Sequence, residues 1–123
     1  MMIVVENARV TETPNAVMAS LATPSLGSKD LSTWRVSMQE GAQGPVHVVD
    51  REQVWVTLAG TVEFIADGSA KLVRTGQAVI LPAHEARQVR VVDGPVDALV
   101  CMSIGGFASA PGSDERHPLP WAE

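Results

Sequence analysis

Four side chains that can exchange protons or bind polar ligands lie in two short stretches of this chain: His47, Gln53, His84 and Arg87. The first stretch, residues 44–60, reads GPVHVVDREQVWVTLAG, and the second, residues 76–91, reads GQAVILPAHEARQVRV. An imidazole takes up or releases a proton near neutral pH, an amide both donates and accepts hydrogen bonds, and a guanidinium pairs with carboxylates or phosphates. If the two stretches face each other, these groups suit recognition of, or proton transfer on, a small carbonyl compound or anion.

Arg87 has two interpretations that the sequence leaves open. It can form an exposed ion pair with Glu85 or Glu52, which is a weak and common arrangement. Alternatively, it points into the interior, where a guanidinium needs an anion or several carbonyl groups as partners. In that second case, Arg87 would bind a carboxylate, an enolate or a phosphate of a ligand.

The other candidates also have a structural interpretation beside the functional one. His47 and His84 can be ordinary hydrogen-bonded histidines of a turn and a loop, since a single imidazole pairs without any catalytic role. Gln53 can pair with the backbone instead of with a ligand. Three large apolar side chains are expected either in the core or against a bound ligand: Trp34, Met38 and Trp55.

The elements that carry these residues are expected to be short β-strands. Residues 31–40 alternate between apolar and polar side chains, which is typical of a half-buried strand. Asp67-Gly68 indicates a tight hairpin, because both central positions of a type I′ turn favour positive φ. With no convincing helix, we expect an all-β antiparallel sandwich or barrel. Its strands are predicted at residues 31–40, 46–49, 53–58, 61–65, 71–74, 78–81, 87–92 and 96–104.

The regions on either side of residues 31–104 are less regular. Residues 2–5 are apolar and could form a first edge strand, and residues 17–22 could be a strand or one helical turn. Residues 105–123 are rich in Gly, Pro, Ser and Ala, and Trp121 in this tail is expected to dock on the domain or on a partner subunit. No linker divides the chain of 123 residues, so we predict a single domain.

Composition excludes several classes of partner. The net charge is −5 and no run of Lys or Arg stands out, which argues against nucleic-acid binding. No apolar run reaches the roughly 18–20 residues of a membrane span. The single cysteine, Cys101, forms no intramolecular disulfide and fits a reducing compartment. The first residues lack the pattern of a signal peptide, so we expect a cytoplasmic protein.

The two stretches resemble the paired motifs of the cupin superfamily. In the first motif, four residues fall in register: Gly44, His47, Gln53 and Gly60. In the second motif Gly76 and Pro82 are in register, whereas His84 stands where Gly is usual and Arg87 where the last His is usual. The resemblance covers residues 31–104 and implies a double-stranded β-helix, the jelly-roll β-barrel, of antiparallel strands around a small cavity. It also implies a homodimer.

The resemblance further implies that most of the usual metal ligands are replaced. Cupins normally hold a metal with three histidines and one carboxylate, and the matching positions are His47, Val49, Gln53 and Arg87. Only His47 is an ordinary ligand, because Val49 has no donor atom, Gln53 is a weak neutral ligand and Arg87 is a cation. We therefore expect no Fe, Mn, Ni or Zn. The alternative that keeps a metal would use His47, Gln53 and His84, completed by water.

With that alternative metal site, the protein would be a metal-dependent cupin oxygenase. Two other classes of function remain open. The first is a metal-independent isomerase, epimerase or cyclase, in which His47 is the catalytic base or acid and Gln53 and Arg87 stabilise an enolate. The second is a cupin that binds or senses a small ligand without converting it. In both, the ligand is expected to be anionic or to carry a carbonyl group. Its contacts would come from Gln53, Arg87, Trp55, Met38, Trp34 and His84.

Overall fold

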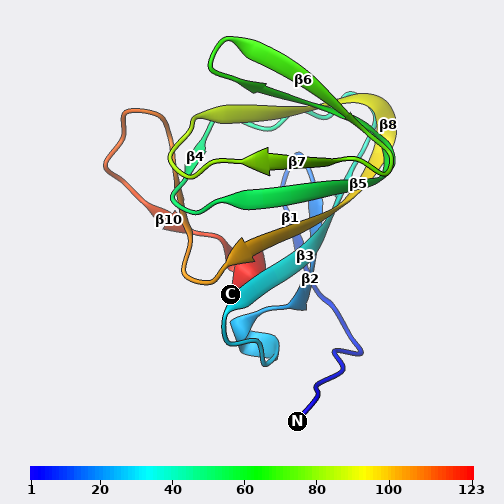
Figure 1. Cartoon of the computed structure of the whole chain (residues 1–123), viewed down its shortest axis with the longest axis vertical. Helices are drawn as coiled ribbons and strands as arrows, with labels where there is room; N and C mark the ends of the chain where they lie inside the picture. The colour runs from blue at the N-terminus through cyan, green and yellow to red at the C-terminus, as the bar shows by residue number, and fades with distance from the viewer.

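The computed structural model describes residues 1–123 as two antiparallel β-sheets with two single-turn 3₁₀ helices (Figure 1). The larger sheet has the strand order β1-β2-β3-β8-β5-β6, with β7 also paired to β5. Its strands are β1 (Arg9–Glu12), β2 (Val17–Ala22), β3 (Leu31–Met38), β5 (Gln53–Ala66), β6 (Ser69–Arg74), β7 (Ala78–Leu81) and β8 (Arg87–Ser103). The smaller sheet, in the order β10-β9-β4, contains β4 (Val48–Val49), β9 (Phe107–Ser109) and β10 (His117–Pro118). The helices are η1 (Pro24–Leu26) and η2 (Pro120–Ala122).

These sheets confirm the predicted all-β, antiparallel jelly-roll, but they are not closed into a barrel. The two-residue strand β4 pairs only with β9 in the smaller sheet. The loop that leads from β3 into β4 is joined to β8 only by isolated bridges, Gln43 to Arg90 and His47 to Arg87. The larger sheet therefore keeps free edges at β1 and β6.

The long strands β5 and β8 give the larger sheet its shape. Both bend at the same level, where their ladder is irregular around residues 59–61 and 93–97, so the sheet folds over itself (Figure 1). Gly60 sits at this bend with φ of 79°, and a Cβ atom there would lie 2.5 Å from the Pro95 carbonyl oxygen. The first-motif glycine is therefore needed for the close approach of two backbones.

Most predicted strands are present, although several are longer than expected. The predicted strands at 53–58 and 61–65 form one strand, β5, and those at 87–92 and 96–104 form one strand, β8. Asp93-Gly94-Pro95, between the two predicted strands, forms no break in β8, although only Asp93 has a ladder partner in β5. The Asp67-Gly68 hairpin is confirmed, with φ of 50° and 71° and Ala66 paired with Ser69.

The two ends of the chain differ from the sequence-based expectation. Residues 2–5 form no strand and are largely exposed, whereas residues 17–22 are strand β2, paired with an unpredicted strand β1. The tail contains β9, β10 and η2, and η2 packs against β1, β2 and β3. Neither 3₁₀ helix has the length or hydropathy to cross a lipid bilayer.

The hydrophobic core lies between the folded-over halves of the larger sheet and the smaller sheet. On β3, the predicted alternation is confirmed: Trp34, Val36 and Met38 are buried, and Arg35 and Ser37 are exposed. β8 repeats this alternation with Val96, Ala98, Val100 and Met102 in the core. The apolar inner faces of β3, β5 and β8 thus form the wall on which the candidate site is built.

Candidate functional site

A cavity of about 350 Å³ opens between the sheets on the apolar face of β3 and β5. It is lined by the β1–β2 turn, by β3, by the segment from Gly44 to Val49, by the start of β5 and by the C-terminal tail. Its polar lining is sparse, and among the lining residues His47 is the only titratable one. The sequence-predicted residues that line it are His47, Gln53, Trp34, Met38 and Trp55.

The large apolar candidates occupy core and cavity wall at once. Trp34 and Met38 are buried core residues of β3 whose side chains also face the cavity. Trp55 on β5 is half-buried and contacts Phe64 edge-to-face, with ring centroids 5.1 Å apart. Its indole N–H is buried and has no hydrogen-bond partner. The two interpretations that the sequence left open for these residues are therefore not exclusive.

Arg87 points inward, and the exposed ion pair with Glu85 or Glu52 is wrong. Its side chain is only 2% exposed, and no ion pair in the chain includes it. The guanidinium donates to Gln53 Oε1 at 2.7 Å and to the Glu85 carbonyl oxygen at 3.2 Å. Burial lowers the pKa of Arg87 to about 10, partly opposed by the Glu85 charge, so the group is a cation at neutral pH.

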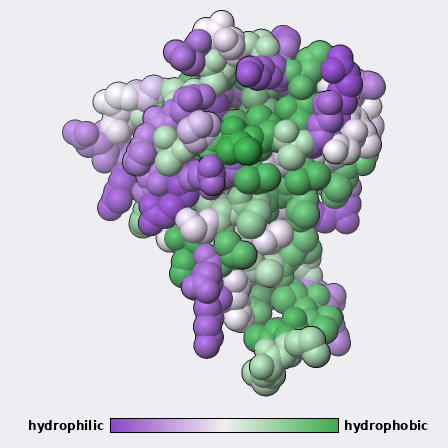
Figure 2. All heavy atoms as spheres, in the orientation of Figure 1, coloured by the Kyte–Doolittle hydropathy of each residue, from purple (hydrophilic) through white to green (hydrophobic).

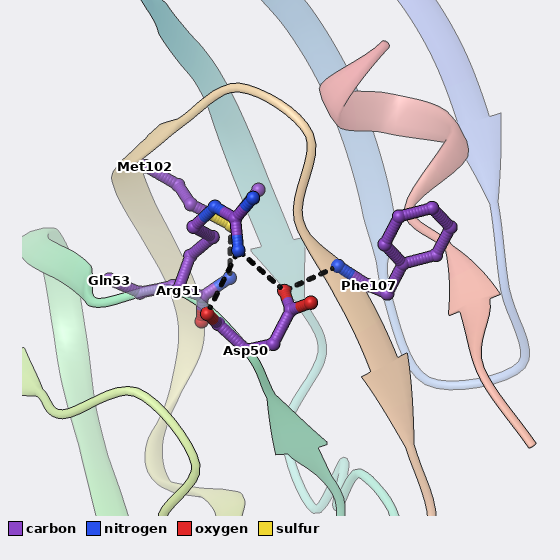
Figure 3. Close-up of polar contacts among 5 residues, drawn as sticks. All are labelled: Asp50, Arg51, Gln53, Met102 and Phe107. Carbon is purple, nitrogen blue, oxygen red and sulfur yellow. Dashed lines mark hydrogen bonds and ion pairs between the residues drawn. The ribbon is translucent and has the colours of Figure 1, made fainter. Parts of the chain in front are cut away.

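Arg87 does not itself line the cavity, and it acts on the cavity through Gln53. A guanidinium has only donors, so the amide of Gln53 must turn its oxygen toward Arg87. The Gln53 Nε2 atom then lies on the other side, 3.6 Å from Met102 Sδ, and the side chain is 5% exposed (Figure 3). Nε2 donates one hydrogen to Met102 Sδ, so Gln53 has one further N–H to offer a ligand in the cavity, while its oxygen is bound by Arg87.

His47 is joined to Arg87 through the backbone and to Pro45 through its ring. The amide of each of His47 and Arg87 donates to the carbonyl oxygen of the other at 3.0 Å. The ring Nδ1 lies 3.0 Å from the Pro45 carbonyl oxygen, and a carbonyl only accepts, so Nδ1 carries the hydrogen. Burial lowers the pKa of His47, with the Pro45 hydrogen bond opposing this and the Arg87 charge adding to it. The neutral ring then keeps its lone pair on Nε2.

The loop after His47 is tied to the tail rather than to the cavity. The carboxylate of Asp50 accepts the backbone N–H of Phe107 at 2.8 Å, and Arg51 lies beside it at 3.5 Å (Figure 3). The Asp50 N–H in turn donates to the Phe107 carbonyl oxygen at 3.1 Å. These bonds hold β9 next to β4, so one wall of the site depends on residues far apart in the sequence.

The family model described as a cupin domain matches residues 34–104, which is more than half of the chain. The chain belongs to the cupin family. No curated protein matches its sequence.

Solved cupin structures are similar in fold. KdgF from Halomonas sp. has a TM-score of 0.71 and 17% identity, over 84% of this chain and 93% of that chain. An RmlC-like cupin from Shewanella frigidimarina has a TM-score of 0.69 and 19% identity, over 81% and 86%. A sugar phosphate isomerase of the cupin superfamily from Silicibacter pomeroyi has a TM-score of 0.64 and 18% identity, over 80% and 68%. At such identities the likeness shows the fold alone.

His84 is one position at which this cupin departs from the usual motif. His84 adopts φ of 68°, the left-handed backbone for which the motif usually has Gly, and its N–H donates to the Val49 carbonyl oxygen at 2.8 Å. Its side chain is exposed and does not line the cavity. The sequence alone could not place the imidazole, since an αL residue can direct its side chain either way.

The residues at the usual metal positions do not fit a metal ion. His47 supplies one imidazole and Val49 supplies none, while the oxygen of Gln53 is already bound by the Arg87 cation. No three His, Cys, Asp or Glu side chains gather anywhere in the chain as a metal would need. The third metal-binding candidate, His84, lies outside the cavity. The guanidinium of Arg87 instead brings a fixed positive charge to this end of the site.

Sequence reasoning missed the far wall of the cavity. Leu119 and Trp121 of the tail and the turn from Thr13 to Ala16 all line it. The one available signal was Trp121, a large apolar residue in a tail that is rich in Gly, Pro, Ser and Ala.

Proposed function

We propose that this cupin binds a small carbonyl compound with a mainly apolar body and isomerises it by proton transfer without a transition metal. The observation that carries the proposal is a complementary pair on one apolar cavity, the amide donor of Gln53 and the free Nε2 of His47. A carbonyl oxygen would accept the Gln53 N–H, while the neighbouring C–H faces the imidazole. One fold neighbour is named a sugar phosphate isomerase, which agrees with this reaction class.

The chemistry follows from the two groups. Neutral His47 takes a proton from the carbon next to the carbonyl group, and the electron pair of that C–H bond moves toward the carbonyl oxygen. Gln53 stabilises the enolate through its N–H, and Arg87 strengthens this donor because its charge polarises the amide. The imidazolium then returns the proton to a different carbon in an isomerase, or to the opposite face in an epimerase. A cyclase would use the same enolate as a carbon nucleophile.

The charge of Arg87 supports an anionic intermediate or ligand. A cation that is 2% exposed and without a carboxylate partner is costly to bury. Negative charge developing on a carbonyl oxygen at Gln53 would lie one amide away from this cation. The site would therefore bind an enolate more tightly than the ketone from which it forms, which is the condition for catalysis.

A cupin that binds its ligand without converting it is the second candidate. The observation that favours it is the absence of any titratable lining residue besides His47. Proton transfers that need separate acid and base groups would then have no second partner. The metal-dependent oxygenase has no such support, because its required ligands do not converge.

Hydrogen exchange separates catalysis from binding. The protein would be incubated in D₂O with a panel of short enolisable ketones and 2-oxo acids, and exchange at the α-carbon would be followed by NMR. We expect His47→Asn to slow exchange by roughly 10²–10⁴-fold with ligand affinity retained, because general-base catalysis contributes about this much. Gln53→Leu should weaken both affinity and exchange. Binding without exchange in the wild-type protein would establish the second candidate instead.

We also infer that the protein is a homodimer, as the family resemblance suggests. The N-terminal segment of residues 1–4 is apolar and exposed, and Ile80 on β7 is 64% exposed. Figure 2 shows these apolar areas at the bottom of the view and over β5 and β7. Because η2 already docks on its own domain, the exposed N-terminal segment is the element that we expect to reach a second copy. Light scattering should show a dimer that dissociates when residues 1–5 are deleted.

A further inference from the structure

The tail segment of residues 119–123 forms one wall of the cavity although it lies outside the cupin motifs. Leu119 is buried and Trp121 is half-buried, and both line the cavity that His47 and Gln53 line. Through η2 the segment contacts β1, β2 and β3. The cavity therefore has a polar end at the motifs and an apolar end at the tail.

A row of side chains holds this wall by its backbone. Ser20 Oγ donates to the Trp121 carbonyl oxygen at 2.7 Å, and Ser32 Oγ donates to that of Ala122 at 2.6 Å. Both hydroxyl-bearing residues are fully buried. Bonds from two further side chains complete the row: Arg9 Nη1 to Pro120 O at 3.0 Å, Arg9 Nη2 to Glu123 O at 2.8 Å and Ser25 Oγ to Glu123 O at 2.5 Å. Four consecutive backbone oxygens are thus bound, which makes the segment a specifically seated element.

The seat lies at a defined distance from the polar end of the cavity. In the sheet, Ser32 pairs with Met102, which pairs with Gln53, so the residue that holds Ala122 and the residue that carries the amide are two strand spacings apart along the sheet. Two spacings amount to about 10 Å. A ligand whose carbonyl oxygen is bound at Gln53 would extend its apolar part toward Leu119 and Trp121, which line the same cavity of about 350 Å³.

The holding residues and the lining residue are separate. Arg9, Ser20 and Ser32 do not line the cavity, whereas Trp121 does. Among the three tryptophans of the lining, Trp34 and Trp55 lie on sheet strands, and Trp121 alone is carried by the tail. Its indole can be shortened without removing a strand residue of the core.

We propose that Trp121 determines which ligands the cavity accepts, by limiting how far the apolar end of the ligand extends from the head group bound at Gln53. The head-group part of this inference rests on the proposed carbonyl-binding function. The wall itself rests only on the cavity and on the hydrogen bonds that seat the tail.

A chain-length series of 2-alkanones tests the proposal. Wild-type protein should bind longer alkanones with increasing affinity up to one chain length and then bind them poorly. Trp121→Leu should move this limit to a longer chain, and Trp121→Ala further still. For the first alkanone that the wild type excludes, we expect a gain of about ten-fold or more in affinity. The exposed His117→Ala, in the same tail, is the matched control and should leave the limit unchanged. An identical limit in all variants would overturn the proposal.

A second probe separates this proposal from the proposed function. If no alkanone binds to any variant, the carbonyl-binding function fails. Binding of 1-anilinonaphthalene-8-sulfonate then tests whether Trp121 limits the apolar end of the cavity. Trp121→Ala should bind this bulky apolar dye about ten-fold more tightly than the wild type while keeping a cooperative thermal transition. Unchanged dye affinity would overturn the proposal that Trp121 limits the apolar end of the cavity. If Trp121→Ala does not fold, Trp121→Leu and the double variant Ser20→Ala, Ser32→Ala, which loosens the wall without altering the lining, give the same readout.

Discussion

The two ends of the cavity are held in place by different kinds of contact. At the polar end, Gln53 begins β5 and pairs with Met102, and Arg87 begins β8 and pairs with Ala66. The bends of these two strands and the side-chain bond between Arg87 and Gln53 bring the two residues together. At the apolar end, Trp121 lies on a single turn of 3₁₀ helix that is held by side-chain donors from β1, β2, β3 and η1. A strand ladder resists local change, whereas a segment seated by separate hydrogen bonds can be altered residue by residue. Under the two proposals above, the strands would hold the groups that react with the ligand, and the tail would determine which ligands fit.

The largest expected effect comes from rebuilding the polar end as a metal site. The triple variant Val49→His, Gln53→Glu, Arg87→His adds the three missing ligands to His47, which completes the usual set of three histidines and one carboxylate. We expect it to bind Ni²⁺ or Zn²⁺ with a Kd on the order of 1 μM or tighter. Native mass spectrometry and elemental analysis would measure this, with no stoichiometric metal expected in the wild type.

The control for that prediction is a variant that keeps the Arg87 guanidinium. The double variant Val49→His, Gln53→Glu retains Arg87, whose charge pairs with the new carboxylate and repels a divalent ion. It should bind metal far more weakly than the triple variant. Equal metal binding by the two variants would contradict the view that Arg87 replaces the metal.

Gly60 at the bend of β5 should be much less tolerant of a side chain than another glycine of similar φ. An alanine Cβ there would lie 2.5 Å and 2.6 Å from the Pro95 and Asp93 carbonyl oxygens. We expect Gly60→Ala to lower the free energy of unfolding by about 3 kcal/mol or more. Gly68, with φ of 71° and no atom within 4 Å of an added Cβ, is the matched control and should lose only about 1–2 kcal/mol. Urea denaturation would measure both, and equal losses would show that the bend is not crowded.

The pH dependence of exchange at the α-carbon should follow the protonation of His47. Burial lowers the pKa of His47, so the ring stays neutral somewhat below the ordinary value near 6.5. Exchange at the α-carbon should therefore be constant above that value and fall about ten-fold per pH unit once the folded pKa is passed. The unfolded chain takes up this proton more readily than the folded one. The fold therefore loses stability as the pH falls through about 6.5, and His47→Asn should lack that loss.

The smallest expected effect concerns the seat of the tail. Ser32→Ala leaves the Ala122 carbonyl oxygen without its buried donor. We expect a loss of about 1–2 kcal/mol in the free energy of unfolding, with proton exchange at the polar end unchanged. The exposed Ser113→Ala in the tail is the control and should cost less than about 0.5 kcal/mol. A loss of catalytic exchange in Ser32→Ala would show that the two ends of the cavity are not independent.

Local sequence patterns determined the fold class and most of its strands. The alternation of residues 31–38 and the Asp67-Gly68 turn depend on side-chain direction and on backbone φ, which neighbouring residues control. The cupin motif spacing put Gly60 in register, and the structure shows that this glycine lies at a close approach of two backbones. Local patterns could not predict that β5 and β8 continue through their bends, because that continuity comes from pairing between the two strands.

Only the tertiary structure decided how the candidate site is assembled. The sequence could place Arg87 either at the surface or inside, since its direction depends on the bridge to His47 and on the Gln53 acceptor across the sheet. Likewise, a positive φ at His84 and a tryptophan in the tail do not reveal where their side chains lie. Trp121 reaches the cavity because Ser20 and Ser32, about ninety or more positions away in the chain, bind its segment. Contacts of such separation depend on the packing of the whole chain, and no local pattern encodes them.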